Sequence, residues 1–474
     1  MLTLADVFEA LGGNRPGINM PVITDAVIDS RQAIPGCIFI ACKGENVDGH
    51  AYVQDAFDRG ASFALIDHDI EGTFSRIDLR KKKNVNQIEN LSLPVCLVVE
   101  NSIKALQEIA RFWRNKQVEM RVVGVTGSVG KSTTKELITE VLSTRYRTSK
   151  NPGNLNNEIG LPLSVLKLGT SIERAVLEMG FYVPGEIAFL CGIAKPHIGV
   201  VTNIGTVHAE RAGSQETIAE GKSELVQALP PSPDGVAILN YDDPLVKAMA
   251  QKTNARVFFY GLNPLADIWA DEIESLGLEG IQLRLHYQHE TLHLKVPLIG
   301  QHSVHTVLRA AAVGLVENLS WEEIITGLTS GHAQLRLVAV RSESGALLLD
   351  DTYNASPESS LSALNLLADL DGRRLAVLGD MLELGQYERQ GHEMVGLRAA
   401  QVSDYLITVG ERSHLTAEAA RRSGMKANHI YEFEKTSEVI SFLKGFLTRM
   451  DVVLIKGSRG IHMDQIVSAL EVPE

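Results

Sequence analysis

Short apolar runs alternate with amphipathic segments along most of the chain, and this alternation predicts an α/β fold. Between residues 121 and 261, buried strands are predicted at RVVGV, AVLEMG, HIGVVTNIG, GVAILNYDD and RVFFYG. Helices are predicted at KSTTKELITEVLSTR and TIAEGKSELVQAL. Because strands that alternate with helices form βαβ units, we expect a mainly parallel sheet in this region.

The same pattern returns after residue 333 and predicts a second, doubly wound α/β domain. Its strands are predicted at ALLLDD, RRLAVLGD, YLITVG and DVVLIKGS, and its helices at ESSLSALNLLADL, HEMVGLRAAQ, HLTAEAARRSG and SEVISFLKGFL. No G-x-G-x-x-G follows a strand there, which argues against a dinucleotide site. Residues 1–100 contain only short mixed elements, and a helical pattern from Ile103 to Arg114 follows them.

Length and composition agree with several globular domains. The chain has 474 residues, 45% hydrophobic and 22% charged, and at about 150 residues per domain this suggests three domains. Lysine and arginine number 45 against 58 for aspartate and glutamate, and the net charge of −13 disfavours non-specific nucleic-acid binding. The basic run at residues 80–83 is most simply a solvated loop, and a nucleic-acid patch is the remote alternative.

Nothing in the sequence suggests export or membrane insertion. The amino terminus lacks the features of a signal peptide, and no apolar run approaches the ~20 residues that span a bilayer. The four cysteines have neither metal-binding nor redox spacing, so we expect reduced thiols. We therefore expect a cytoplasmic protein with neither a membrane nor a nucleic-acid partner.

The strongest chemical signal is the segment VVGVTGSVGKSTTKE, which joins a strand, a glycine-rich turn and a helix. The backbone N–H groups of such a turn, with the amino end of the helix, bind phosphate oxygens. We predict a nucleotide-binding phosphate loop made of Thr126, Gly127, Ser128, Val129, Gly130, Lys131 and Ser132. Lys131 would reach the outer phosphates, and the Ser132 hydroxyl would bind Mg²⁺. Val125 stands where the strict pattern has glycine, and the alternative is a tight turn with a chance Gly-Lys-Ser.

Two further polar residues fall at the same predicted sheet edge. Glu178 lies at the carboxyl end of a strand, where open α/β sheets place ligands, and its carboxylate could hold Mg²⁺ against phosphates. The alternative for Glu178 is a surface glutamate. His208 follows the strand HIGVVTNIG, and a lone histidine is as easily structural as functional. The histidines at 286, 289 and 293 lie in a predicted hairpin, where alternate positions point to opposite faces, so no zinc site is expected.

The departure at Val125 points to a family. T-G-S-V-G-K-S at residues 126–132 resembles the variant phosphate loop of the Mur ligases, which build the peptide of the bacterial cell wall. The resemblance covers essentially the whole chain, with D-S-R at residues 29–31, D-G-H at 48–50 and NPGNLNNEIGLP at 151–162. DDTYNASPES, GDMLELG and KGSRG in the last domain resemble the branch that adds D-alanyl-D-alanine to UDP-N-acetylmuramoyl-tripeptide.

This resemblance implies three α/β domains. They are a small mixed UDP-substrate-binding domain (1–100), a central P-loop ATPase-like domain with a parallel sheet (101–332) and a Rossmann-like, doubly wound domain for the dipeptide (333–474). It also implies an ATP- and Mg²⁺-dependent amide ligase that works through an acyl phosphate. We expect this ligase to be a monomer.

The resemblance assigns roles to individual residues. Catalytic roles fall to Lys131, Glu178, His208, Lys222 and Arg336, and a carbamylated Lys222 would join Ser132 and Glu178 as a Mg²⁺ ligand. Asp351 would lie near the nucleotide ribose, and the substrates would be bound by Ser30, Arg31, Asn156, Asn157, Asn354, Lys456 and Ser458. Ser303 and Thr306 stand where the family has two asparagines that help to seat the adenine, and His302 remains.

The sequence leaves two other functions open. Another member of the superfamily, such as a folylpolyglutamate synthase, would share the phosphate loop but lack D-S-R and D-x-Y-N-A-x-P. A nucleotide-binding protein without catalysis is the alternative outside enzymes.

Overall fold

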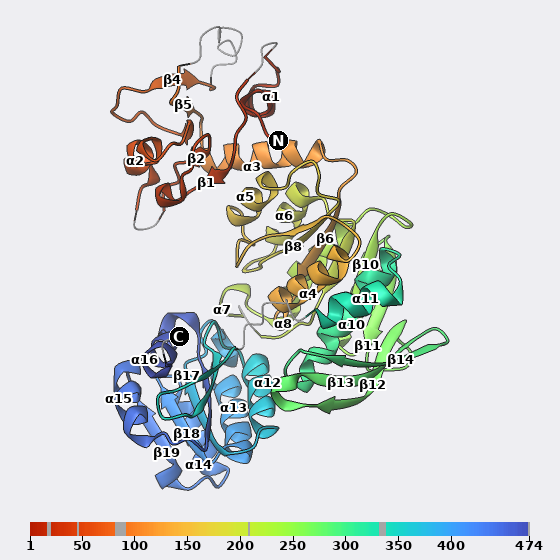
Figure 1. Ribbon diagram of the computed structural model, residues 1–474, viewed down its shortest axis with the longest axis vertical. Helices are drawn as coiled ribbons and strands as arrows, with labels where there is room; N and C mark the ends of the chain where they lie inside the picture. Colours follow the sequence, from red (N-terminus) through yellow and green to blue (C-terminus); the bar gives the residue numbers. More distant parts are fainter. Residues whose placement is uncertain (17–19, 45–46, 81–91, 207–208, 331–337, 473–474) are drawn as a thin grey trace.

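Three α/β domains follow one another in the computed structural model, which describes residues 1–16, 20–44, 47–80, 92–206, 209–330 and 338–472. In Figure 1 the N-terminal domain (red and orange) and the C-terminal domain (blue) lie at opposite ends of the central domain (yellow and green). This confirms the predicted three-domain α/β fold. The boundaries near residues 100 and 332 stay predictions.

The N-terminal domain is a five-stranded parallel sheet covered on both faces. Its strands stand in the order β1 (Ala26–Val27), β2 (Ile38–Ile40), β3 (Phe63–Ile66), β5 (Val95–Val98) and β4 (Ser75–Asp78). The helices α1 (Leu4–Gly12) and α3 (Ser102–Asn115) share one hydrophobic core with this sheet, and α2 (Val53–Asp58) belongs to the other. Of the basic run at 80–83 only Arg80 lies within the described residues, and it forms an ion pair with Asp78 at the end of the edge strand β4.

The central domain is built on a nine-stranded sheet that is parallel from β7 to β12. Its strands stand in the order β14 (Glu290–Val296), β13 (Ile281–Tyr287), β12 (Ile268–Ser275), β11 (Arg256–Gly261), β10 (Val236–Asn240), β9 (Ile198–Val201), β6 (Arg121–Thr126), β8 (Arg174–Glu178) and β7 (Thr148–Lys150). The strands β12, β13 and β14 form an antiparallel meander, of which the sequence predicted only the hairpin. Buried and exposed residues alternate in this meander because one of its faces meets solvent.

Helices cover both faces of the parallel part. On one face lie α4 (Lys131–Ser143), α10 (Val304–Val316) and α11 (Trp321–Thr329), and on the other α5 (Gly160–Leu166), α6 (Glu186–Ala194) and α8 (Gln215–Gln227). Two short helices, α7 (Ala209–Ala212) and α9 (Pro244–Ala248), belong to the second of these layers. The strand β6 is buried on both sides, which explains its nearly uninterrupted apolar sequence before the phosphate loop.

The C-terminal domain confirms the predicted doubly wound sheet. Its strands stand in the order β15 (Val338–Arg341), β16 (Leu347–Asp351), β20 (Asp451–Lys456), β17 (Arg373–Gly379), β18 (Tyr405–Val409) and β19 (Ile430–Phe433), and only the edge strand β15 is antiparallel among those described. One face is covered by α12 (Pro357–Ala368), α13 (Glu388–Val402) and α14 (His414–Arg422), and the other by α15 (Thr436–Phe446) and α16 (Asp464–Leu470).

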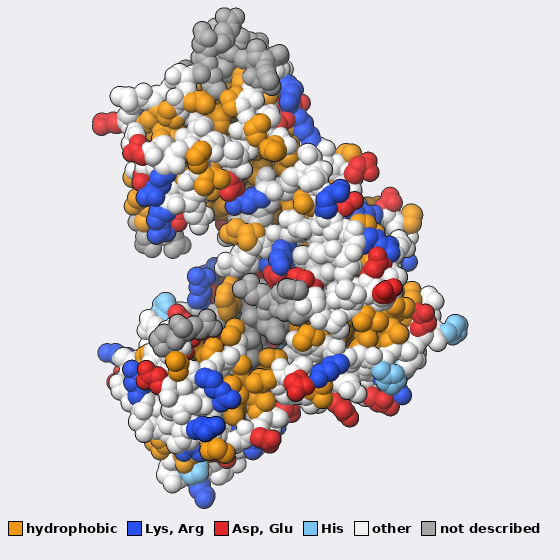
Figure 2. Space-filling view, in the orientation of Figure 1, with side chains coloured by type: hydrophobic (Ala, Val, Ile, Leu, Met, Phe, Trp, Pro, Cys, Tyr) orange, Lys and Arg blue, Asp and Glu red, His pale blue; other side chains and the backbone are white. Residues whose placement is uncertain are grey.

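The three domains are joined unequally. The C-terminal domain contacts the central one directly, since Glu358 Oε1 accepts a hydrogen bond from the Thr206 amide (3.1 Å) and Gln386 donates one to the Gly213 carbonyl (3.0 Å). Figure 2 shows a deep cleft between the N-terminal and C-terminal domains. The N-terminal domain is held to the central one through α3, whose Trp113 donates to the Leu168 carbonyl (2.9 Å). Among the described helices, none has the length and apolar character needed to cross a membrane.

Candidate nucleotide and metal site

The phosphate loop forms the turn between β6 and α4, and two glycines shape it. Gly127 has a φ of 141°, and a Cβ there would lie 1.8 Å from the Thr202 hydroxyl oxygen; Gly130, with a φ of 81°, precedes the first residue of α4. Asn203, which follows β9, fixes the loop from the side. Its carbonyl accepts from the Ser128 amide (2.9 Å), and its Oδ1 accepts from the Val129 amide (2.9 Å). The predicted strand, turn and helix are therefore all present, in a rigidly held form.

Replacing Gly127 by alanine should weaken ADP binding at least about tenfold, because the new methyl group overlaps Thr202 and the loop must move. Isothermal calorimetry with ADP measures the effect. Gly424→Ala is the matched control, since Gly424 also has a positive φ (93°) but has nothing within 4 Å of its added Cβ. Equal ADP affinity in Gly127→Ala and the wild type would show that the loop does not hold the nucleotide.

Lys131, Ser132 and Glu178 meet at the carboxyl edge of the sheet. Lys131 Nζ donates to the carbonyl oxygens of Gly127 (2.9 Å) and Ser128 (3.1 Å). Ser132 Oγ donates to one carboxylate oxygen of Glu178 at 2.6 Å, and Glu178 is only 1% exposed. A hydroxyl beside a carboxylate offers the hard oxygen donors that Mg²⁺ prefers. The residues present therefore fit the ion that the sequence implied.

The segment after β7 holds Glu178 in place. Asn156 Nδ2 donates to the second carboxylate oxygen of Glu178 (2.9 Å), and Asn151 Oδ1 accepts from the Glu178 amide (2.8 Å). The buried Lys135 donates to the Asn151 carbonyl (2.8 Å) and so ties this segment to α4. Asn157, which was predicted to bind substrate, accepts from the Gly160 amide (2.8 Å) at the start of α5. No role was predicted for Asn151 or Lys135; the many polar residues in NPGNLNN were the available signal.

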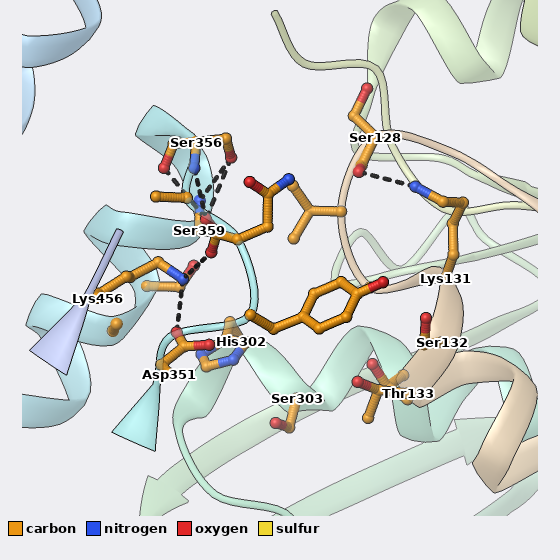
Figure 3. Close-up of a pocket in the computed structure, with 18 of the residues that line it drawn as sticks. Ser128, Lys131, Ser132, Thr133, His302, Ser303, Asp351, Ser356, Ser359 and Lys456 are labelled. Atoms are coloured by element: carbon orange, nitrogen blue, oxygen red, sulfur yellow. Dashed lines mark hydrogen bonds and ion pairs between the residues drawn. The ribbon is translucent and has the colours of Figure 1, made fainter. Parts of the chain in front are cut away.

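A pocket opens between the central and C-terminal domains (Figure 3). The central domain contributes residues 128–133 of the phosphate loop and α4, together with His302, Ser303 and Thr306. The C-terminal domain contributes Asp351, Asn354 and Lys456, and also Tyr353 and the first turns of α12, which sequence reasoning missed. The pocket thus joins the phosphate loop to the positions that were predicted to meet adenine and ribose.

Two residues that were predicted for different ligands form one ion pair. Lys456 Nζ lies 2.7 Å from Asp351 Oδ2 and donates to the Asn354 carbonyl at 2.9 Å. Ser458 does not line the pocket: its hydroxyl accepts from the Leu382 amide (2.9 Å) and its amide donates to the Asp380 carbonyl (3.0 Å). In the KGSR segment Lys456 alone therefore reaches the pocket lining.

Lys222 lies on α8 and is 1% exposed. Its ammonium nitrogen is 4.6 Å from the centre of the Phe181 ring. Burial, and secondly the positive charge of Lys131, hold the pKa of Lys222 well below the usual range, although Glu186 acts in the opposite direction. A lowered pKa increases the share of Lys222 that is present as the neutral amine.

The two residues predicted to bind UDP lie in the N-terminal domain, away from the pocket. Asp29 accepts from the Arg31 amide (3.0 Å), and its carboxylate lies 2.7 Å from the Arg31 guanidinium, whose side chain is 79% exposed. Ser30 is buried beside them. Two predicted catalytic residues, His208 and Arg336, lie outside the described residues.

Two histidine-containing groups lie elsewhere in the described parts of the chain. Asp48, His50 and His68 form the one three-ligand group found in the described part of the chain, but both ring nitrogens of His50 are engaged, by Asp48 Oδ1 (2.7 Å) and the Asp67 amide (3.2 Å). In the β13–β14 hairpin, His286 and His293 share one face, because the register pairs residue 284 with 293 and 286 with 291. The prediction that the hairpin histidines point to opposite faces was wrong for His286 and His293. His286 binds Asp271 (3.0 Å) and stacks on a tryptophan.

Comparisons with known proteins agree with this geometry along the whole chain. Residues 23–114 match the Mur ligase family catalytic domain, residues 125–314 the Mur ligase middle domain, and residues 335–459 the Mur ligase glutamate ligase domain. The UDP-N-acetylmuramoyl-tripeptide–D-alanyl-D-alanine ligase of Bacillus subtilis (strain 168) is 33% identical over 475 residues, which cover 99% of this chain and 98% of that protein. The ligase of the same name from a Synechocystis species is 35% identical over 94% of this chain and 92% of its own length.

Solved structures give the same answer. A crystal structure of MurF from Acinetobacter baumannii has a TM-score of 0.83 at 28% identity and covers 98% of both chains. MurF ligase from Thermotoga maritima in complex with ADP has a TM-score of 0.76 at 27% identity, over 94% of this chain and 96% of that one. A Mycobacterium tuberculosis folylpolyglutamate synthase complexed with ADP shares the fold alone, with a TM-score of 0.61 at 16% identity over 78% of this chain and 94% of that one. From the matches to all three domains and the full-length relatives, we conclude that the chain belongs to the Mur ligase family.

Proposed function

We propose that the chain is an ATP-dependent ligase that joins D-alanyl-D-alanine to UDP-N-acetylmuramoyl-tripeptide. The observation that supports this most strongly is the 33% identity, over 99% of the chain, to a ligase of that name. The pocket supports it independently, because it places a phosphate loop opposite the segment DDTYNASPES, which resembles the branch of the family with this activity.

The proposed reaction has two steps. An oxygen of the tripeptide's terminal carboxylate attacks the γ-phosphorus of ATP, and the bond from that phosphorus to ADP breaks. The amine of D-alanyl-D-alanine then attacks the acyl carbon to give a tetrahedral intermediate and loses a proton. Phosphate leaves with the original carboxylate oxygen, and an amide remains.

The residues around the phosphate loop suit the first step. The backbone amides of the loop and the start of α4 bind phosphate oxygens, and the Lys131 ammonium stabilises the charge on the transferred phosphoryl group. The Lys131 ammonium donates to two carbonyls of the loop itself, and these bonds hold it next to the place that the phosphates would take. We assign Asp351 and Lys456, on the opposite wall, to the ribose and the dipeptide.

Ser132 and Glu178 would hold Mg²⁺, and a carbamate on Lys222 would supply a further oxygen ligand. When bound, Mg²⁺ neutralises negative charge on the phosphate oxygens. Asn151 and Asn156 would keep the Glu178 carboxylate oriented for this task.

An acyl phosphate hydrolyses readily, so the site must exclude water while it exists. The cleft in Figure 2 leaves the N-terminal domain apart from the C-terminal one. We therefore propose that the N-terminal domain binds the UDP end of the substrate and carries it toward the pocket as the domains close. Because the substrates are ATP and a UDP-linked sugar, we place the reaction in the cytoplasm, and we propose a monomer.

Arg31→Ala should raise the KM for the UDP-linked tripeptide at least about tenfold and leave the KM for ATP within about twofold. The exposed guanidinium can bind a diphosphate by charge-assisted hydrogen bonds. Steady-state ADP release measures both constants. Arg80→Ala is the matched control, because Arg80 binds Asp78 in the same local geometry on the same domain. Equal tripeptide KM values for the Arg31 and Arg80 variants would contradict the assignment.

The whole function is tested by leaving out one substrate at a time. We expect ADP release to require both the UDP-linked tripeptide and D-alanyl-D-alanine. Release that requires a folate and glutamate would indicate the folylpolyglutamate synthase alternative. ADP binding without release under any substrate combination would indicate a non-catalytic nucleotide-binding protein.

A further inference from the structure

Arg309 is a buried arginine that lies beneath the phosphate loop. It belongs to α10, is 4% exposed and sits within the hydrophobic layer that α10 forms with the sheet. Its Nη2 donates to the Thr306 hydroxyl (2.7 Å) and its Nη1 to the Tyr260 hydroxyl (3.4 Å). Neither partner is an anion, so the charge of this guanidinium is not neutralised by its hydrogen bonds.

Arg114 shows how a purely structural buried arginine is satisfied in the same chain. It is also 4% exposed, and it donates to four backbone carbonyls, those of Ala194, Gln117, Met120 and Lys195. Arg309, by contrast, has a buried Nε without a hydrogen-bond partner. Its Cζ lies 5.6 Å from the centre of the Tyr260 ring, and it forms no ion pair with a carboxylate in the described parts of the chain. A buried cation left in this condition is unfavourable unless an anion compensates it.

The position of Arg309 shows where such an anion would be. A Cβ on Gly130 would lie 3.4 Å from Arg309 Nη2, so the guanidinium lies directly under the last glycine of the phosphate loop. Gly130 precedes α4, whose amino end is the positive end of the helix dipole, and Lys131 follows immediately. Three positive features therefore gather around one loop, and a polyphosphate above that loop would relieve their repulsion.

We propose that Arg309 is a nucleotide-binding residue that acts through the phosphate loop, as an additional positive charge beneath Gly130. The inference rests on the proposed binding of ATP in the pocket. Arg309 is a positioning residue, since the loop separates it from the phosphates, and it takes no part in bond formation. Thr306, its hydroxyl partner, lines the same pocket and stands where the family has an asparagine, so this chain places an arginine–threonine pair behind its nucleotide site.

The test is ADP calorimetry on the full chain with Arg309→Met, Arg309→Lys and Arg114→Met. We expect Arg309→Met to weaken ADP binding at least about tenfold at low salt, and Arg309→Lys to remain within about threefold of the wild type. Affinity for the UDP-linked tripeptide should not change.

Thermal unfolding without nucleotide separates this role from a structural one. Arg309→Met replaces a buried cation that has no carboxylate partner, so its unfolding temperature should equal that of the wild type or exceed it. Arg114→Met should unfold at a lower temperature than the wild type and bind ADP with normal affinity.

Two outcomes would overturn the proposal. One is normal ADP affinity in Arg309→Met. The other is a loss of ADP affinity in Arg309→Met that is matched by an equal loss of tripeptide affinity and by a lower unfolding temperature. If the wild-type chain itself fails to bind ADP, the proposed function fails, and this result is distinct from the other two.

Discussion

Lys131→Ala should lower the rate of ADP release at least about 100-fold while the protein stays folded. One preorganised charge on a transferring phosphoryl group is commonly worth about 3 kcal/mol or more, and about 1.4 kcal/mol corresponds to a factor of ten. The folded state should tolerate the change, because the Lys131 ammonium donates to two carbonyls at a part-buried loop surface rather than filling the core. Steady-state ADP release and thermal unfolding measure the two effects.

The control for Lys131→Ala is Lys247→Ala, on α9 of the same domain, where the exposed lysine lies over a tyrosine ring. This variant should keep wild-type activity. Turnover of Lys131→Ala within a few fold of the wild type would mean that the phosphate loop does not perform the chemistry that we assign to it.

Lys222→Ala should be nearly inactive, and a short carboxylate such as formate should partly restore it. The side chain is buried, and its lowered pKa makes the neutral amine available for reaction with CO₂. A carbamate would turn a cation near the metal site into an anionic oxygen ligand. Formate can supply an equivalent oxygen in the space that the alanine variant leaves, whereas Lys222→Arg should not be restored because the guanidinium still fills that space and remains a cation.

The rescue is measured as ADP release at rising formate concentration, with chloride at equal ionic strength as the control. Equal stimulation by chloride would show a general salt effect. Full activity of Lys222→Ala in CO₂-depleted buffer would show that Lys222 is an ordinary buried lysine and that no carbamate is needed.

The elements that the sequence predicted best are those with one strong local cause. β6 is a nearly uninterrupted apolar run followed by glycines and a lysine, so its strand, turn and helix could be placed from the sequence. Glu178 could be assigned to the same edge as Ser132, because the carboxyl ends of parallel strands lie together, and the 2.6 Å contact agrees with this.

What could not be predicted depends on partners that are distant in the sequence. Nothing local to Lys456 or Asp351 indicates that they form an ion pair across 105 positions. The apolar positions of β12 suit a parallel or an antiparallel neighbour. The sequence therefore could not predict that β12 joins the hairpin as the third strand of an antiparallel meander, which the strand pairing shows. In the sequence, Arg309 is one charged residue in an alanine-rich helix. Its proposed role in nucleotide binding follows only from the packing of α10 under the phosphate loop.

An oxygen-18 label directly tests the transfer of the γ-phosphoryl group of ATP to the tripeptide carboxylate. The UDP-linked tripeptide, labelled in its terminal carboxylate, is incubated with ATP and D-alanyl-D-alanine, and the released phosphate is analysed by mass spectrometry. We expect one ¹⁸O atom in each released phosphate, and we expect the amount of phosphate to equal the amounts of ADP and of the new amide product. Phosphate without the label, formed while ADP accumulates, would show that water attacks ATP and would contradict phosphoryl transfer to the carboxylate.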